Sequence, residues 1–128
     1  QELYGQALLA AQEYKASLEP LRKAAAAADK GNGNLYLQLG HVYSTLEDWK
    51  GAAEVMRLAI QKGVDRPDQA YLYMGQAFFN LEDFKRAADA FAQAAKSPNS
   101  RRSADSWMSY IDLEQQRIKR LADAGLRR

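Results

Sequence analysis

The sequence contains no cysteine, which excludes disulfide frameworks, cysteine zinc sites and thiol nucleophiles. No apolar run approaches the roughly 18 residues that a membrane-spanning helix needs. The net charge is only +2, which by itself gives no reason to expect a nucleic-acid partner. β-Branched residues are scarce, with three Val, three Ile and one Thr in 128 residues. These residues favour strands, so we do not expect a sheet protein.

Alanine and leucine dominate the apolar residues, with 23 Ala and 15 Leu. Both residue types lose little conformational freedom in a helix. A length of 128 residues suits a single domain with one hydrophobic core. The composition therefore predicts one all-α domain.

An internal repeat organises the chain. Residues 36–63 align without a gap on residues 71–98, at an offset of 35, and ten of the 28 positions are identical. A weaker copy precedes them, in which Gly5, Tyr14 and Ala24 fall under Gly40, Trp49 and Ala59. Self-similarity at a fixed period indicates stacked structural units. The shared residues include a glycine, an acidic pair and small residues: Gly40/Gly75, Glu47/Glu82, Asp48/Asp83 and Ala52/Ala87.

Each copy predicts two helices. In the middle copy, apolar residues at helical spacing run through 36–46 and again through 49–60. The acidic pair 47–48 between them predicts an N-cap for the second helix. Gly63 is expected to end that helix with a left-handed backbone, and Pro67 is expected in the first turn of the next one.

Glycine inside the first helix of each pair has a steric meaning. Gly40 and Gly75 each cost about 1 kcal/mol relative to Ala in a helix. We expect close approach of the paired helix in return, with Ala52 and Ala87 as the small partners on it. Larger residues are expected to fill the wider spaces between copies: Tyr43, Phe78, Met56 and Phe91.

Both strong copies resemble the tetratricopeptide repeat. The motifs are Tyr36-x2-Leu39-Gly40-x2-Tyr43 … Ala52-x3-Met56 and Tyr71-x2-Met74-Gly75-x2-Phe78 … Ala87-x3-Phe91. They depart from the family pattern in having Tyr for the first Trp and a period of 35 rather than 34. The resemblance implies a right-handed superhelical α-solenoid of antiparallel helix pairs. It divides the chain into a partial repeat (1–32), two repeats (33–67 and 68–100), and a capping helix with a basic tail (101–128).

After Pro98 the pattern changes to one long predicted helix from Ser103 to Ala124. Its apolar face includes Trp107 and Tyr110 as expected core anchors, and its polar outer side suits the end of a solenoid. Residues 100–111 are also similar to the C-terminal end of repeat proteins that accompany TonB-type energy-transduction systems in proteobacteria. This second resemblance implies a bacterial envelope or periplasmic location.

No catalytic or metal-binding arrangement is expected. His41 is the only histidine, and His41, Ser44 and Asp48 lie along one helix and its following turn, so they do not converge as a triad. We interpret His41 as a surface polar residue. The acidic pairs recur at one repeat position, which favours helix capping over acid–base catalysis. The segment 31–34 lacks the Lys-Ser/Thr and the preceding strand of a phosphate loop. The sequence thus predicts no enzyme activity, no metal and no cofactor.

The C-terminal segment 101–128 is basic, with seven Lys or Arg and four Asp or Glu. A role with nucleic acid or an acidic membrane is one interpretation. No aromatic residues are interleaved for base stacking, so a solvated face and tail are favoured.

The remaining candidate site is a groove. The family resemblance implies that the first helix of each repeat lines a concave surface, and helical spacing predicts which residues face it. The face carries no Lys or Arg, so the family's carboxylate clamp for acidic chaperone tails is not expected. Tyr73 and Phe79 are expected as exposed aromatics, whereas Leu37 and Leu72 could instead pack on the neighbouring pair. The predicted face comprises Asn34, Leu37, Gln38, His41, Ser44, Thr45, Gln69, Leu72, Tyr73, Gln76, Phe79 and Asn80.

We therefore expect a non-catalytic scaffold that holds a neutral or partly apolar peptide or helix of a protein partner. Two alternatives stay open. One is self-association, because the sequence begins inside a repeat and would leave Leu8 and Tyr14 uncovered. The other is that this segment is the interaction part of a larger enzyme.

Overall fold

The computed structural model describes residues 15–16, 18–20, 22–23 and 33–125. The described chain is all-helical and contains no strand, which confirms the all-α part of the predicted fold. Residues 33–125 form α2 (Asn34–Thr45), α3 (Trp49–Lys62), α4 (Pro67–Asn80), α5 (Phe84–Ala94) and α6 (Pro98–Asp123). Gly5, Leu8, Tyr14 and Ala24, which carry the predicted partial repeat, lie outside the described residues.

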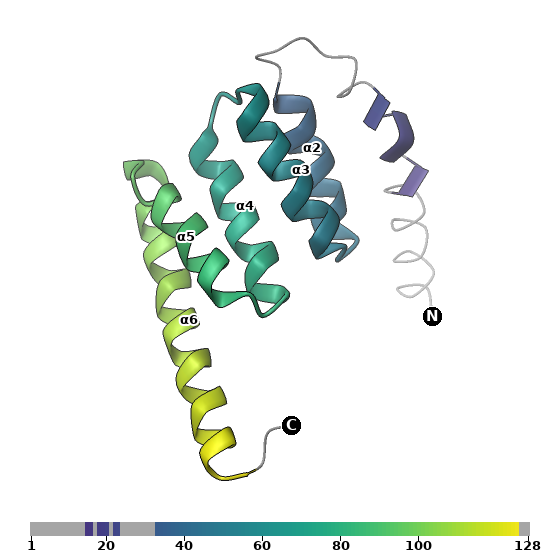
Figure 1. The fold of residues 1–128 in the computed structure, drawn as a ribbon. Coiled ribbons are helices and arrows are strands. Elements are labelled where there is room, and N and C mark those ends of the chain that lie inside the picture. Colours follow the sequence, from purple (N-terminus) through teal and green to yellow (C-terminus); the bar gives the residue numbers. More distant parts are fainter. Residues whose placement is uncertain (1–14, 17, 21, 24–32, 126–128) are drawn as a thin grey trace, which may run out of the picture.

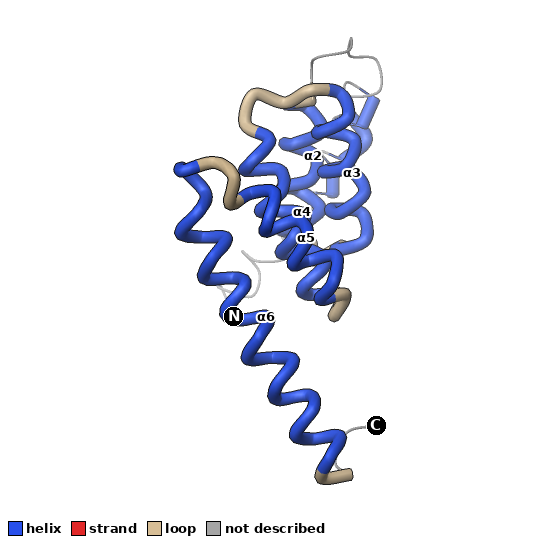
Figure 2. The backbone as a smooth tube through the Cα atoms, turned by 60° about the vertical axis from the view of Figure 1, so that its left-hand side comes forward, coloured by secondary structure: helices blue, strands red, loops and turns tan. Residues whose placement is uncertain are grey.

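The helices pack in chain order. Each helix from α2 to α5 contacts the next one, and α2 also contacts α4, as α4 contacts α6. Short loops join neighbours that lie side by side, so consecutive helices run in opposite directions (Figure 1). The last helix, α6, packs along α5 and extends beyond the other helices (Figures 1 and 2). Among the described residues, no helix combines the length and apolar character needed to cross a membrane.

The acidic pairs perform the predicted capping. Asp48 is the N-cap of α3, and its Oδ1 accepts from the Gly51 N–H at 3.1 Å. Asp83 is the N-cap of α5, and its Oδ1 accepts from the Arg86 N–H at 3.2 Å. Two copies of one sequence feature thus produce the same local structure.

The residues preceding these caps have an unpredicted backbone conformation. Glu47 and Glu82 lie at φ values of 59° and 60°, in the left-handed region that L-residues rarely adopt. The tight turn requires it, because the N–H of the next residue turns back to a carbonyl oxygen in the helix just ended. These bonds are Asp48 to Tyr43 and Asp83 to Phe78, both at 2.9 Å. Gly63, at φ 92°, has the positive φ predicted for the end of α3.

The two helical glycines lie where paired helices come closest. A Cβ on the buried Gly40 would lie 2.3 Å from Met56 Cε. A Cβ on the buried Gly75 would lie 2.6 to 2.7 Å from three ring atoms of Phe91. Close approach at these glycines is therefore present in both pairs. The prediction that Ala52 and Ala87 make this contact was wrong, because a large side chain of the facing helix packs against each glycine.

Ala52 and Ala87 are fully buried but do not supply these closest contacts. The large side chains of Met56 and Phe91 occupy the space that a Cβ would take, instead of filling only the seams between copies. Both are completely buried. The missing Cβ therefore makes room for a core side chain.

Two buried clusters form the core, one centred on α2 and α3 and one on α5 and α6. Phe78 on α4 packs against both, so it connects them. The first cluster contains Leu39, Tyr43, Ala52, Ala53, Val55 and Ala77, and the second contains Ala87, Phe91, Ala94, Ala104 and Ile111.

The last helix begins earlier than predicted, at Pro98 instead of Ser103. Proline suits the first helical position, because its fixed φ is helical and its missing N–H would have no partner there. Trp107 is a core anchor as predicted, since it stacks on Phe91 with centroids 5.4 Å apart and rings 7° from parallel. Tyr110 is not, because it meets Trp107 only edge-on and stays 55% exposed.

A buried carboxylate ties the start of α4 to the start of α6. Asp68 accepts from Arg66 Nη2 at 2.6 Å and from Ser100 Oγ at 2.5 Å. The Arg66 hydrogen bond, followed by the one from Ser100, lowers the pKa of Asp68 from 3.8 to about 2. Asp68 and Ser100 are only 9% and 2% exposed, so the bond between them is shielded from water.

We predict unequal effects of alanine at the two glycines. Alanine improves helix propensity by about 1 kcal/mol. At Gly40 the closest atom is the terminal methyl of the flexible Met56, with Met56 Sδ at 3.0 Å and Val55 Cγ2 at 3.1 Å. Because all three belong to side chains that can shift slightly, Gly40→Ala should change the unfolding free energy by less than about 1 kcal/mol. At Gly75 the obstruction is a ring held by Trp107, so Gly75→Ala should lose roughly 1–2 kcal/mol net. Urea unfolding measures both, and equal effects would contradict this account.

We also predict a pH-dependent contribution from Asp68. A lowered pKa means that the ionised carboxylate stabilises the folded state above its unfolded pKa, and that this contribution disappears as the pH falls through the folded pKa. The melting temperature of wild type should therefore exceed that of Asp68→Asn by a constant amount at neutral pH. The difference should shrink between the ordinary pKa of 3.8 and about 2. A difference that does not vary with pH would show that ionisation is irrelevant to this contact.

Candidate functional site

A hollow of about 380 Å³ lies between α2 and α4. Helical spacing explains why its residues meet. Leu37, Gln38 and His41 occupy one side of α2, while Gln69 and Tyr73 lie one turn apart on α4. The hollow is lined by Leu37, Gln38, His41, Val42, Gln69 and Tyr73. The structure thus brings together five residues of the predicted face, from both copies of the repeat.

An aromatic contact crosses this hollow. The rings of His41 and Tyr73 meet edge-on, with centroids 5.9 Å apart. Gln38 and His41 are exposed, whereas Leu37, Gln69 and Tyr73 are half-buried. None of the six lining residues is Lys, Arg, Asp or Glu. The site therefore offers apolar surface, two amides and two rings.

Val42 is the lining residue that the sequence pattern missed. It is 7% exposed and lies one turn beyond Gln38, a predicted groove residue. That spacing was the available signal. Apolar residues adjacent to a polar stripe are usually core residues, and Val42 is buried although it lines the hollow.

Several predicted residues use their polar groups elsewhere. Asn34 donates to Asp65 Oδ2 at 2.9 Å and accepts from the Asp65 N–H at 3.2 Å, which ties the start of α2 to the loop before α4. Thr45 donates to the His41 carbonyl at 3.0 Å, and Asn80 donates to the Gln76 carbonyl at 2.9 Å. These side chains stabilise their own segments, and none of them lines the hollow. Gln76 and Ser44 are half-buried and lie outside it as well.

Phe79 was expected to be an exposed aromatic, and that expectation was wrong. Its ring lies 5.5 Å from Phe84 and 5.3 Å from Trp107, edge-on to both. Leu72 packs against the buried cluster of α5 and α6, in line with the alternative that it is a packing residue. The physical reason is α6, which brings Trp107 against this side of α4. Tyr73, also expected to be exposed, is half-buried as well, although it borders the hollow.

The described residues assemble no group of three or more His, Cys, Asp or Glu side chains that could hold a metal ion. His41 faces Tyr73, and its side chain makes no hydrogen bond to a described residue. The site is therefore best described by its shape and polarity.

No protein-family model matches the sequence, and no curated protein matches it.

Proposed function

We propose that this chain is a non-catalytic scaffold that binds a peptide or helix of a protein partner in the hollow between α2 and α4. The architecture that we propose with it is a tetratricopeptide-like solenoid, a right-handed superhelix of antiparallel helix pairs capped by α6. The repeated turn supports this architecture. Both copies have a left-handed Glu, an Asp cap and a glycine under a core side chain, at an offset of 35 residues.

The observation that carries the function is the composition of the hollow. Gln38 and Gln69 come from facing helices, and an amide side chain both donates and accepts hydrogen bonds, as a peptide main chain does. Leu37 and Val42 offer apolar surface between them. A volume of about 380 Å³ accommodates side chains of a bound segment. This chemistry fits a neutral or partly apolar peptide.

The same composition argues against other ligand classes. Phosphate groups and acidic chain ends need Lys or Arg, and none lines this hollow. An apolar groove with a few amides is typical of helix or peptide docking. As part of the same proposal, the similarity of residues 100–111 to companions of TonB-type systems supports a bacterial envelope assembly as the setting.

We predict that Tyr73→Ala weakens partner binding while the protein stays folded. Affinity capture from extracts of the source cells, with wild type and variant as baits, should recover a protein that the variant loses. Tyr73 is half-buried at the edge of the hollow, so its truncation should lower the unfolding free energy by only about 1 kcal/mol.

Phe79→Ala is the control for Tyr73→Ala, because it truncates an aromatic residue of the same helix that packs against the core. Its ring packs between Phe84 and Trp107, so truncation should cost roughly 3 kcal/mol in urea unfolding. If Tyr73→Ala lost as much stability as Phe79→Ala, or if it captured the same proteins as wild type, the hollow would not be the partner site.

A further inference from the structure

The two junctions between successive repeats differ in one respect. At the first junction, the guanidinium of Arg22 lies over the ring of Tyr43, 5.9 Å from its centroid. Arg22 also donates from Nη2 to the Tyr43 hydroxyl and forms an ion pair with Glu19 at 3.7 Å. An arginine from the preceding segment therefore covers this aromatic ring.

At the second junction, a different helix supplies the arginine. The offset of 35 matches Arg57 to Arg22 and Phe78 to Tyr43. Phe78 has no hydroxyl group to accept a hydrogen bond. The guanidinium over its ring belongs to Arg86 of α5, 5.9 Å from the centroid. The residue matching Arg86 at the first junction is Gly51.

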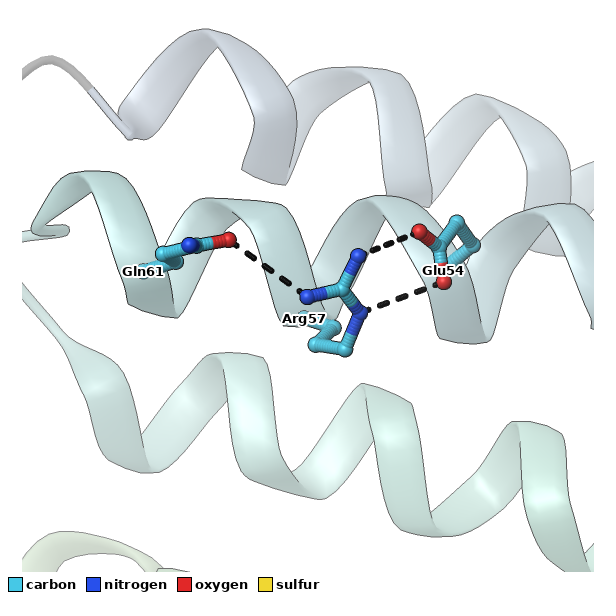
Figure 3. A network of polar contacts seen from close by, with 3 residues as sticks. All are labelled: Glu54, Arg57 and Gln61. Carbon is cyan, nitrogen blue, oxygen red and sulfur yellow. Dashed lines mark hydrogen bonds and ion pairs between the residues drawn. The ribbon is translucent and has the colours of Figure 1, made fainter.

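Arg57 consequently stays on its own helix. It donates to both carboxylate oxygens of Glu54, at 2.5 and 3.2 Å, and to Gln61 Oε1 at 3.4 Å (Figure 3). A hollow of about 440 Å³ remains between α3 and the turn from α4 to α5. It is lined by Lys50, Ala53, Glu54, Arg57, Phe78, Leu81, Asp83 and Arg86.

The floor of this second hollow is apolar. Ala53 and Phe78 lie beside Leu81, one of the few large apolar side chains in the described chain that are exposed, at 37%. None of the residues lining this hollow lines the one between α2 and α4.

The rim carries excess positive charge. Glu54 is paired with Arg57, and Asp83 caps α5 and lies 3.5 Å from Arg86 Nε. Lys50 has no hydrogen-bond or ion-pair partner among the described residues. Three cations thus border the hollow against two carboxylates, and both carboxylates are already engaged.

We propose that this hollow is a second docking site, which binds an acidic segment of a partner protein. An aliphatic or aromatic side chain of that segment lies on Leu81, beside the Phe78 ring that Arg86 covers. A neighbouring carboxylate binds Lys50 and the outer nitrogen atoms of Arg57 and Arg86. The partner carboxylate takes the acceptor role that the Tyr43 hydroxyl has at the first junction.

The test uses peptides selected from a random dodecapeptide display library on the wild-type protein, then synthesised with a fluorescent label. We expect one enriched class with Asp or Glu next to Leu, Ile or Phe. Its dissociation constant, measured by fluorescence polarisation, should rise at least about tenfold in Lys50→Glu and rise with salt. Arg102→Gly removes an exposed arginine of α6 that lines neither hollow, and it should leave the dissociation constant unchanged.

A second variant changes the lining of the hollow itself. Phe78→Tyr combined with Arg86→Gly gives this junction the residues of the first one, so Arg57 gains a hydroxyl acceptor and a vacant ring face. This variant should also lose the acidic peptides, and thermal melting should confirm that it is folded. Absence of an acidic–apolar class, or equal binding of such peptides to wild type and Lys50→Glu, would overturn the proposal. Peptides that bind the wild type and Lys50→Glu but not Tyr73→Ala would be assigned to the hollow between α2 and α4. The proposals for the two hollows can therefore be refuted independently.

Discussion

The contact between a helical glycine and a large buried side chain is the constraint on which the rest of the structure depends. Gly75 lets the Phe91 ring lie against the backbone of α4, and that ring stacks on Trp107 of α6. One contact therefore connects three consecutive helices. Gly40 and Met56 form the equivalent contact between α2 and α3. The contacts of α4 with α3 and α2 then set where the faces of α2 and α4 meet.

The different chemistry of the two hollows depends on positions that differ between the two copies of the repeat. Positions that maintain the pairs are matched between copies, as the glycines, Asp caps and left-handed Glu residues are. Many exposed positions differ, although Lys50 and Lys85 match, and these differences decide the local chemistry. Amides and rings make the hollow between α2 and α4 neutral, whereas Lys50, Arg57 and Arg86 make the other one basic at its rim. A scaffold with matched cores and divergent surfaces can present two chemically different sites.

Much of this was predictable from the sequence. The 35-residue offset gave the helix order and the caps at Asp48 and Asp83, because capping depends on residues only three positions apart. Helical spacing also placed Leu37, Gln38 and His41 on one face. The positive φ of Glu47 and Glu82 was not predictable, since only the tight turn between the packed helices imposes it.

The remaining differences concern which neighbour covers a residue. Periodicity gives the angle of a side chain around its own helix, but not the helix that packs there. Phe79 is covered because α6 places Trp107 against it, while Tyr110, three residues after Trp107, stays exposed. Likewise, the sequence indicated that Gly75 permits close approach, but only the packing identified the Phe91 ring as its partner.

The most direct test of the central contact is a double-mutant cycle between Gly75 and Phe91, measured by urea unfolding. If the ring is what opposes a Cβ, Gly75→Ala should destabilise the wild type but be neutral or stabilising in a Phe91→Leu background, since leucine lacks the obstructing Cε1 and Cζ atoms and its Cδ methyl groups can rotate aside. The two changes would then show a favourable coupling of about 1–2 kcal/mol. Strictly additive effects would mean that the glycine and the ring act independently, and they would contradict the account.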